Sequence, residues 1–196
     1  MKIYVNNQEL NFTLENEKTC GDILNQLEIE FEKNNGTIFN IEVNGKTVKA
    51  EEIDAVSQKV IEEIETIHII SIFAQDICEN LKTLLPRIEN INKNFEELPV
   101  FLQGQNQGKV PQILTEFADI FDNLCHLISL TALFPDYFDK ITVEENRLTD
   151  FIKEFSPFLI DFEDSIKNND TVTICDIAEY EIKPRFISLA NTLKEL

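Results

Sequence analysis

The sequence predicts an α+β protein in which a small strand-rich module is followed by an antiparallel bundle of four helices. Three features of the 196 residues lead to this prediction. Apolar and polar residues alternate with the strand period in the first third, and an Asn-Gly pair there indicates a tight hairpin. From Ala74 onward the apolar residues recur at helical spacing instead. We therefore expect two domains, residues 1–73 and residues 74–196.

The first module opens with a predicted β-hairpin. Ile3 and Val5 alternate with polar residues, and Asn6-Asn7 supplies the turn. The return strand has the same alternation, with its apolar residues at Leu10, Phe12 and Leu14.

A helix is predicted next. Thr19 and Asp22 have the spacing of a capping box, in which two side chains satisfy the free N–H groups of the first turn. Asn34-Asn35-Gly36 should end this helix, because Asn and Gly tolerate the left-handed backbone conformation. The apolar residues between these two signals recur at helical spacing: Ile23, Leu24, Leu27 and Phe31.

The rest of the first module predicts a second hairpin and a final strand. Residues 38–43 form an apolar strand, Asn44-Gly45 is the strongest hairpin signal in the chain, and residues 46–49 return from it. A short polar segment with Ile53 and Val56 then leads to the last apolar strand, residues 67–72. His68 should point away from the face that carries Ile67 and Ile69, because strand side chains alternate.

This order of hairpin, helix, strand pair, short connection and strand resembles the ubiquitin-like β-grasp fold, over residues 1–73. The Val43-Asn44-Gly45 turn is similar to that of the sulfur-carrier members of the fold. Those carriers end in a free Gly-Gly tail that is activated at its carboxylate. Here Ile72 continues into a predicted helix and the sequence contains no Gly-Gly pair. The resemblance therefore implies the fold and argues against a conjugation or sulfur-carrier role.

Four amphipathic stretches make up the second domain. Each carries an apolar stripe too wide for a lone helix in water, so the helices must bury these stripes against one another. Pro157 and Pro184 lie inside the third and fourth of them, and Pro86 should kink the first. The stripes cover residues 77–98, 110–127, 148–166 and 174–193. The turns between them are a polar loop at 103–109, the break Phe134-Pro135-Asp136, and Asn168-Asn169-Asp170, where Asp170 is a predicted N-cap.

The chain is strongly acidic, with a formal net charge of −19. Residues 1–73 hold 6 basic and 14 acidic side chains, and the remainder holds 11 and 22, so both domains share the charge. Such a surface repels phosphate backbones and anionic lipid headgroups, which excludes nucleic acid and membrane surfaces as expected partners. It suits a basic protein partner, although acidity also serves solubility alone.

The sequence predicts a cytoplasmic protein. Met1 and Lys2 lead straight into the first strand with no apolar signal segment. No apolar run approaches the roughly 20 residues of a membrane span, so no membrane insertion is expected. The four cysteines are scattered without metal-ligand or disulfide spacing, and we expect them to be reduced and buried: Cys20, Cys78, Cys125 and Cys175.

No catalytic motif emerges, and we expect no enzyme, no cofactor and no metal. Residues 104–110 look superficially like a phosphate-binding loop, but the spacing is one residue short and Val110 stands where Ser or Thr should hold magnesium. His126 follows Cys125, yet neighbouring helical residues point about 100° apart and no third group orients the pair. Residues 103–109 are better interpreted as a helix–helix loop.

Two segments are candidate partner-binding surfaces. The aromatic residues Phe134, Tyr137 and Phe138 surround one interhelical break, where they either plug the end of the bundle or present an apolar patch. On the fourth helix, Asp176, Glu179 and Tyr180 have the i, i+3 and i+4 spacing of one face. That acidic-aromatic face is either simply solvated or docks a basic helix.

These observations favour a non-enzymatic protein–protein interaction protein: an adaptor, a regulator or a chaperone-like binder. Small acidic helical proteins that hold secreted or flagellar subunits before export look broadly similar in composition. The expected partner is another protein that is basic or exposes an amphipathic helix. Two alternatives stay open: a self-assembling structural protein, such as a homodimer through Phe-rich helix faces, and a metal- or ligand-binding bundle that uses scattered carboxylates.

Overall fold

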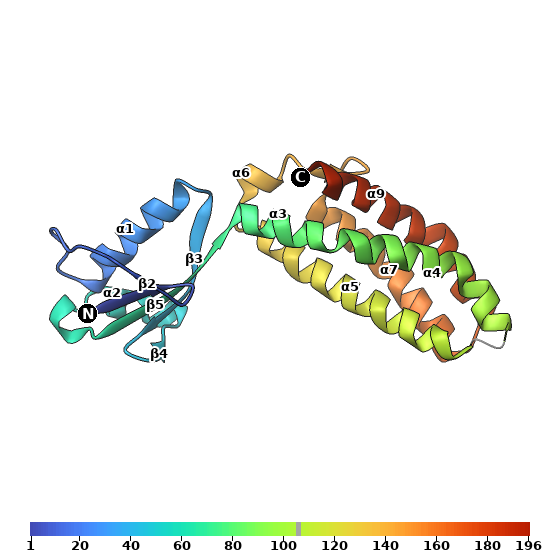
Figure 1. Ribbon diagram of the computed structural model, residues 1–196, viewed down its shortest axis with the longest axis horizontal. Coiled ribbons are helices and arrows are strands. Elements are labelled where there is room, and N and C mark those ends of the chain that lie inside the picture. The colour runs from blue at the N-terminus through green and yellow to red at the C-terminus, as the bar shows by residue number, and fades with distance from the viewer. Residues whose placement is uncertain (105–106) are drawn as a thin grey trace. The chain divides into compact units, whose positions relative to one another are not determined.

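A computed structural model describes residues 1–104 and 107–196 of the chain (Figure 1). The chain divides into two compact units, Met1–Asp76 and Ile77–Leu196. The first contains a mixed sheet and the second is helical, so the predicted α+β class is confirmed. β5 (Thr66–Phe73) passes directly into α3 (Ala74–Thr83), with no residue between them.

Within the described residues, the first unit holds a five-stranded sheet in the order β2-β1-β5-β3-β4. β1 is parallel to its neighbour β5, whereas the pairs β1–β2, β3–β4 and β3–β5 are antiparallel. Short helical turns connect β4 to β5. Besides β5, the strands are β1 (Lys2–Val5), β2 (Gln8–Leu10), β3 (Gly36–Val43) and β4 (Lys46–Thr47), and the turns are η1 (Ala50–Glu52), α2 (Ile53–Ser57) and η2 (Ile61–Glu63).

One long helix, α1 (Cys20–Glu32), packs on one face of this sheet (Figure 1). Alternate strand residues such as Ile67 and Ile69 reach the core beneath it, because successive strand side chains point to opposite faces. His68 lies between these two residues in the chain and stacks on Tyr4 of β1, with ring centroids 4.4 Å apart. The buried core residues are Ile3, Cys20, Ile23, Leu24, Leu27, Val43, Ile64, Ile67 and Ile69.

The predicted capping box begins α1. The Thr19 hydroxyl accepts a hydrogen bond from the Asp22 N–H at 3.2 Å. In return, one Asp22 carboxylate oxygen accepts from the N–H groups of Lys18 and Thr19, both at 2.9 Å. Together these contacts satisfy N–H groups that the first helical turn leaves without a carbonyl partner.

These bonds make the stability of the first unit depend on pH through Asp22. The backbone N–H groups of Lys18 and Thr19 hold the pKa of Asp22 below its usual value, because they favour the charged carboxylate. The stability that the Asp22 carboxylate contributes is therefore fully present above the unfolded pKa of about 3.9, and it is lost as pH falls through the lower folded pKa. We expect Asp22→Asn to destabilise the protein at neutral pH. The stability gap to the wild-type protein should narrow below about pH 3.9 in urea unfolding, whereas a constant gap would contradict this assignment.

The two hairpin turns of the sheet use the left-handed conformation that their asparagines predict. Asn6 and Asn7 have φ angles of 49° and 67°, and Asn44 and Gly45 have 50° and 78°. Positive φ at both central residues matches the twist of a tight two-residue hairpin. Asn35 also adopts a positive φ, 52°, where the sequence predicted the end of α1.

The second unit is a bundle of amphipathic helices, in agreement with the four predicted stripes. The first stripe differs from its prediction: instead of one helix kinked at Pro86, it forms α3 and a separate α4 that begins at Leu85. Pro86 lies in the first turn of α4, where its missing N–H costs little. The long helices after α3 are α4 (Leu85–Gln103), α5 (Val110–Thr131), α7 (Leu148–Lys167) and the continuous run of α8 (Thr171–Asp176), η4 (Ile177–Ile182) and α9 (Lys183–Glu195).

The loop after α4 was the site of the phosphate-loop resemblance. Its residues 105–106 lie outside the described part of the chain. The described residues that follow form one short turn, η3 (Gln107–Lys109), before α5. The Lys109 ammonium lies 4.8 Å from the centroid of the Phe101 ring.

Phenylalanine rings from every long helix meet in the core of the bundle. The Phe117 ring of α5 lies 5.5 Å from Phe95 of α4, 5.8 Å from Phe162 of α7 and 5.7 Å from Phe186 of α9, measured between centroids. Phe186 also lies 5.7 Å from Phe155 of α7. These tilted and edge-on contacts are the favoured geometries for aromatic pairs, so the cluster ties the four helices together.

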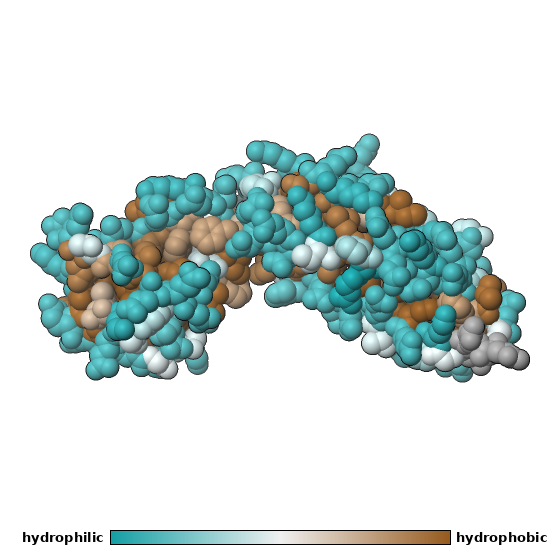
Figure 2. Space-filling model, in the orientation of Figure 1, coloured by the Kyte–Doolittle hydropathy of each residue, from teal (hydrophilic) through white to brown (hydrophobic). Residues whose placement is uncertain are grey.

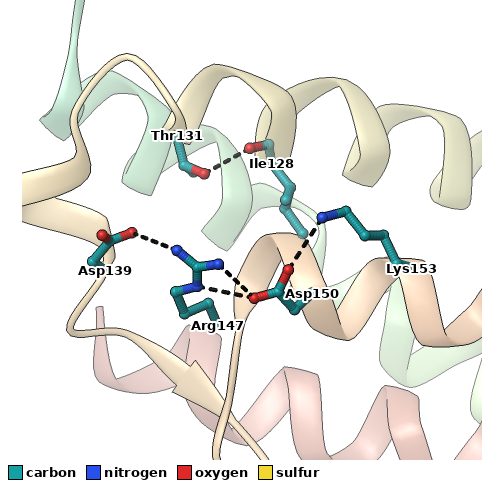
Figure 3. A network of polar contacts seen from close by, with 6 residues as sticks. All are labelled: Ile128, Thr131, Asp139, Arg147, Asp150 and Lys153. Atoms are coloured by element: carbon teal, nitrogen blue, oxygen red, sulfur yellow. Dashed lines mark hydrogen bonds and ion pairs between the residues drawn. The ribbon is translucent and has the colours of Figure 1, made fainter.

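The short helix α6 (Pro135–Phe138) and a small hairpin precede α7. The sequence did not predict this hairpin, which consists of β6 (Thr142–Val143) and β7 (Asn146–Arg147). Figure 3 shows how its last residue is held: Arg147 contacts Asp139 at 3.9 Å and Asp150 at 2.9 Å, and Lys153 reaches Asp150 at 3.1 Å. The turn residues Glu144 and Glu145 have positive φ, 51° and 70°, but their identity gives no sequence signal for such a turn. Glu-Glu lacks the Asn-Gly signature of such turns.

Across the described residues, the helices are too short or too polar to cross a membrane.

Candidate interaction surface

The aromatic break after α5 is built into the bundle. Phe134 and Phe138 are buried, at 9% and 3% exposed. Tyr137 is half-buried, and its hydroxyl oxygen lies 3.9 Å from Cys78 Sγ, a contact that raises the pKa of Tyr137. Of the two interpretations of this segment, the structure favours the plug. Burial removes Phe134 and Phe138 from the candidate surface, because a partner cannot reach them.

The second candidate group is accessible. Asp176 ends α8, while Glu179 and Tyr180 lie in η4, and all three side chains are exposed. Tyr180 is 64% exposed, which is unusual for an aromatic side chain in a folded domain. The predicted face is therefore present, but the backbone that carries it is a π-helix and not an α-helix.

Pro184 and the spacing of the core residues explain the π-helix. A proline inside an α-helix has no N–H to donate and its ring clashes with the carbonyl four residues back, here that of Tyr180. The wider turn bonds five residues back instead, and the Lys183 N–H indeed donates to the Ala178 carbonyl. It also keeps Ile177 and Ile182 both in the core; an α-helix would rotate them about 140° apart.

Downstream of Tyr180, the same outer face continues with apolar residues. Pro184 is exposed and Ile187 is 45% exposed, and they follow Tyr180 at steps of four and three residues. We call Tyr180, Pro184 and Ile187 the outer stripe. On the opposite side of this helix Ile182, Phe186 and Leu189 are fully buried. Figure 2 shows apolar residues interrupting the hydrophilic surface where α9 lies in Figure 1.

Ion pairs border the outer stripe on both sides. Lys183 Nζ lies 2.7 Å from a carboxylate oxygen of Glu96 on α4. The Arg185 guanidinium donates to the Glu181 carboxylate at 2.8 Å and lies 4.2 Å from the centroid of the Phe158 ring. These contacts hold the two cations next to the stripe, so the exposed carboxylates of Asp176 and Glu179 dominate the charge at its N-terminal end.

The hairpin before α7 holds α9 on a further side. The Ser188 hydroxyl donates to Glu144 at 2.6 Å, and the Thr192 hydroxyl donates to the Thr142 carbonyl at 3.2 Å. On the α4 side, Lys194 pairs with Glu89 at 2.8 Å. The helix under the outer stripe is thus anchored along its length, so the stripe is a preformed surface.

Cys20 and Cys78 are buried, whereas Cys125 and Cys175, which the sequence also predicted to be buried, are half-buried. Desolvation by burial raises the pKa of all four thiols, which keeps them protonated and weakly nucleophilic at neutral pH. In the part of the chain that the structure describes, no three His, Cys, Asp or Glu side chains gather closely enough to hold a metal ion.

A groove of about 420 Å³ runs between α4 and α5. Its lining is mainly polar and includes Arg87, Thr115, Glu116 and Asp119, with Pro111 and Gln112 completing it. Small-molecule sites are usually enclosed and mostly apolar with a few polar groups, whereas this groove is open and most of its lining residues are polar or charged. The outer stripe is therefore the better candidate for a functional surface.

Two family models and a curated relative match this chain. The family model "TP0873 N-terminal domain" matches residues 1–72. An uncharacterized protein of Treponema pallidum (strain Nichols) is 24% identical over 184 residues, which cover 94% of this chain and 92% of the relative. No solved structure matches. The model "Domain of unknown function (DUF8042)" matches residues 73–192, more than half of the chain, and the protein therefore belongs to the DUF8042 family.

Proposed function

We propose that this protein is a non-enzymatic protein-interaction protein, either an adaptor, a regulator or a chaperone-like binder, that acts in the cytoplasm. The observation that carries the proposal is the outer stripe, an exposed apolar surface beside exposed carboxylates. Surface apolar residues scattered singly are ordinary, but three in helical register on one face are typical of a docking site.

We further propose that the first unit is a ubiquitin-like β-grasp module. The strand order β2-β1-β5-β3-β4, the parallel pairing of β1 with β5, and the single long helix on one face support this assignment. β5 continues into α3, so this module has no free C-terminal tail for conjugation. A binding role fits that arrangement better than a carrier role.

The charge of the chain argues against the self-assembling alternative. Two copies that met through their outer stripes would bring together two chains of net charge −19 each. Like charges brought together across an interface oppose association. A partner of another sequence and opposite charge meets no such penalty.

Isolation of the protein from cells that make it tests the proposal. The tagged chain, captured under native conditions near physiological salt, should bring down one other protein near stoichiometry, identified by mass spectrometry. The double variant Tyr180→Ser, Ile187→Ser should lose it. The matched control is Ile160→Ser, which changes another exposed isoleucine, on α7. Recovery of the tagged protein alone would overturn the proposed function.

A further inference from the structure

We infer that the outer stripe docks a basic amphipathic helix of a partner protein, with the apolar face of that helix on Tyr180, Pro184 and Ile187 and its Lys or Arg side chains on Asp176 and Glu179. This inference rests on the proposed function and adds the chemistry of the partner. It draws on the spacing of the stripe, its rigidity and the distribution of charge around it.

The spacing matches a helical ligand. Tyr180 and Ile187 are seven residues apart, which is about two helical turns or about 10 Å. An amphipathic helix presents apolar side chains at i, i+3 or i+4, and i+7, which cover the same length. Docking by an added β-strand would instead need free N–H and C=O groups at a sheet edge, and a helix face has none to offer.

The stripe is also prepared for binding. Tyr and Pro lose little side-chain entropy when a partner covers them, and Tyr supplies a large contact area. Phe186 and Leu189 beneath the stripe are fully buried, and the ion pair of Lys183 with Glu96 fixes one border. The partner therefore does not have to order this surface, which reduces the cost of association.

The distribution of charge selects a basic partner. Asp176 and Glu179 are exposed at one end of the stripe, while Lys183 and Arg185, which flank Pro184 in the chain, already pair with Glu96 and Glu181. A Lys or Arg from a docked helix would thus meet carboxylates that these cations do not neutralise. The −19 charge of the chain adds long-range attraction, which salt screens over about 8–10 Å.

A model peptide tests the inference without knowledge of the natural partner. The probe is an amphipathic peptide of leucine and lysine, four turns or about 14 residues long, and its counterpart replaces every lysine with glutamate. We expect the Leu/Lys peptide to bind the full chain with one-to-one stoichiometry in titration calorimetry, and more weakly as salt rises. The Leu/Glu peptide should not bind.

Apolar substitutions separate docking at the stripe from general attraction to an acidic protein. Tyr180→Ser with Ile187→Ser leaves the net charge unchanged, and we expect it to weaken Leu/Lys binding at least about tenfold. Ile160→Ser should bind like the wild-type protein. Asp176→Asn with Glu179→Gln should weaken binding mainly at low salt. Circular dichroism of each variant establishes that it is folded.

Two results would overturn the inference: equal binding by the double serine variant and the wild-type protein, or equal binding of both peptides. These results are distinguishable from failure of the proposed function. If native isolation recovers a partner that the double serine variant retains, the protein is an interaction protein whose docking surface lies elsewhere. If the peptide binds as expected but native isolation recovers no partner, the stripe has the inferred chemistry and the proposed function fails.

Discussion

Replacing Phe186 with alanine is expected to lower the free energy of unfolding of the helical unit by about 3–5 kcal/mol. Phe186 is fully buried, and its ring lies 5.7 Å from both Phe117 and Phe155, so it joins α9 to α5 and α7. Alanine would remove this contact area and leave a cavity that three anchored helices cannot close. Chemical unfolding followed by circular dichroism at a helix-sensitive wavelength measures the loss.

The next residue in the chain provides the control. Ile187 is 45% exposed, and Ile187→Ala removes apolar atoms from the same turn without opening the core. Its effect should stay within about 0.5 kcal/mol, as for most surface substitutions. Similar losses for the two variants would mean that Phe186 is not part of a tightly packed core.

Replacing Asn44 with alanine is expected to destabilise the first unit by about 2–4 kcal/mol. The Asn44 side chain accepts hydrogen bonds from the N–H groups of Glu65 and Thr66, at 2.8 and 3.1 Å, and donates to the Glu63 carbonyl at 3.0 Å. It thereby joins the β3–β4 turn to the start of β5. Alanine loses all three bonds and is strained at the φ of 50° that this turn requires.

Two further substitutions at Asn44 separate these causes. Asn44→Gly loses the side-chain bonds but adopts positive φ freely, so it should be less harmful than alanine. Asn44→Asp keeps an oxygen that accepts from the N–H groups of Glu65 and Thr66, and aspartate tolerates the left-handed region. This substitution should therefore lower the stability least of the three. Urea unfolding of the three variants should therefore give the order Ala, Gly, Asp from most to least destabilised. If glycine matched the wild-type protein, the side-chain bonds would contribute nothing.

Only part of the candidate surface was predictable. Asp176, Glu179 and Tyr180 were identified from their spacing, and the structure leaves all three exposed. Phe134, Tyr137 and Phe138 carry an equally strong sequence signal, but Phe134 and Phe138 are buried. Aromatic residues near a helix break serve a core or a surface equally well in sequence, because the difference depends on which distant helices pack there.

The remainder of the outer stripe had a sequence signal that went unused. The core positions Ile177 and Ile182 are five residues apart, a step that fits neither an i+3 nor an i+4 pattern. Pro184 lies two residues after Ile182, and the five-residue step and the proline together indicate a local π-helix. Pro184 and Ile187 also follow Tyr180 at i+4 and i+7, the ordinary spacing of one helical face, so their place beside Tyr180 was predictable from the sequence.

Local chemistry was enough to predict the class of fold, the two hairpins of the first unit, the caps at Thr19 and Asp170 and the four amphipathic stripes. Each of these depends on residues within a few positions of one another, through strand alternation, left-handed Asn and Gly, or helical spacing. Packing between distant segments decided the rest, including the Glu144-Glu145 hairpin and the exposure of the outer stripe. The Glu144 turn, for example, is held by a hydrogen bond from Ser188, 44 residues away in the chain, so no local sequence pattern predicts it.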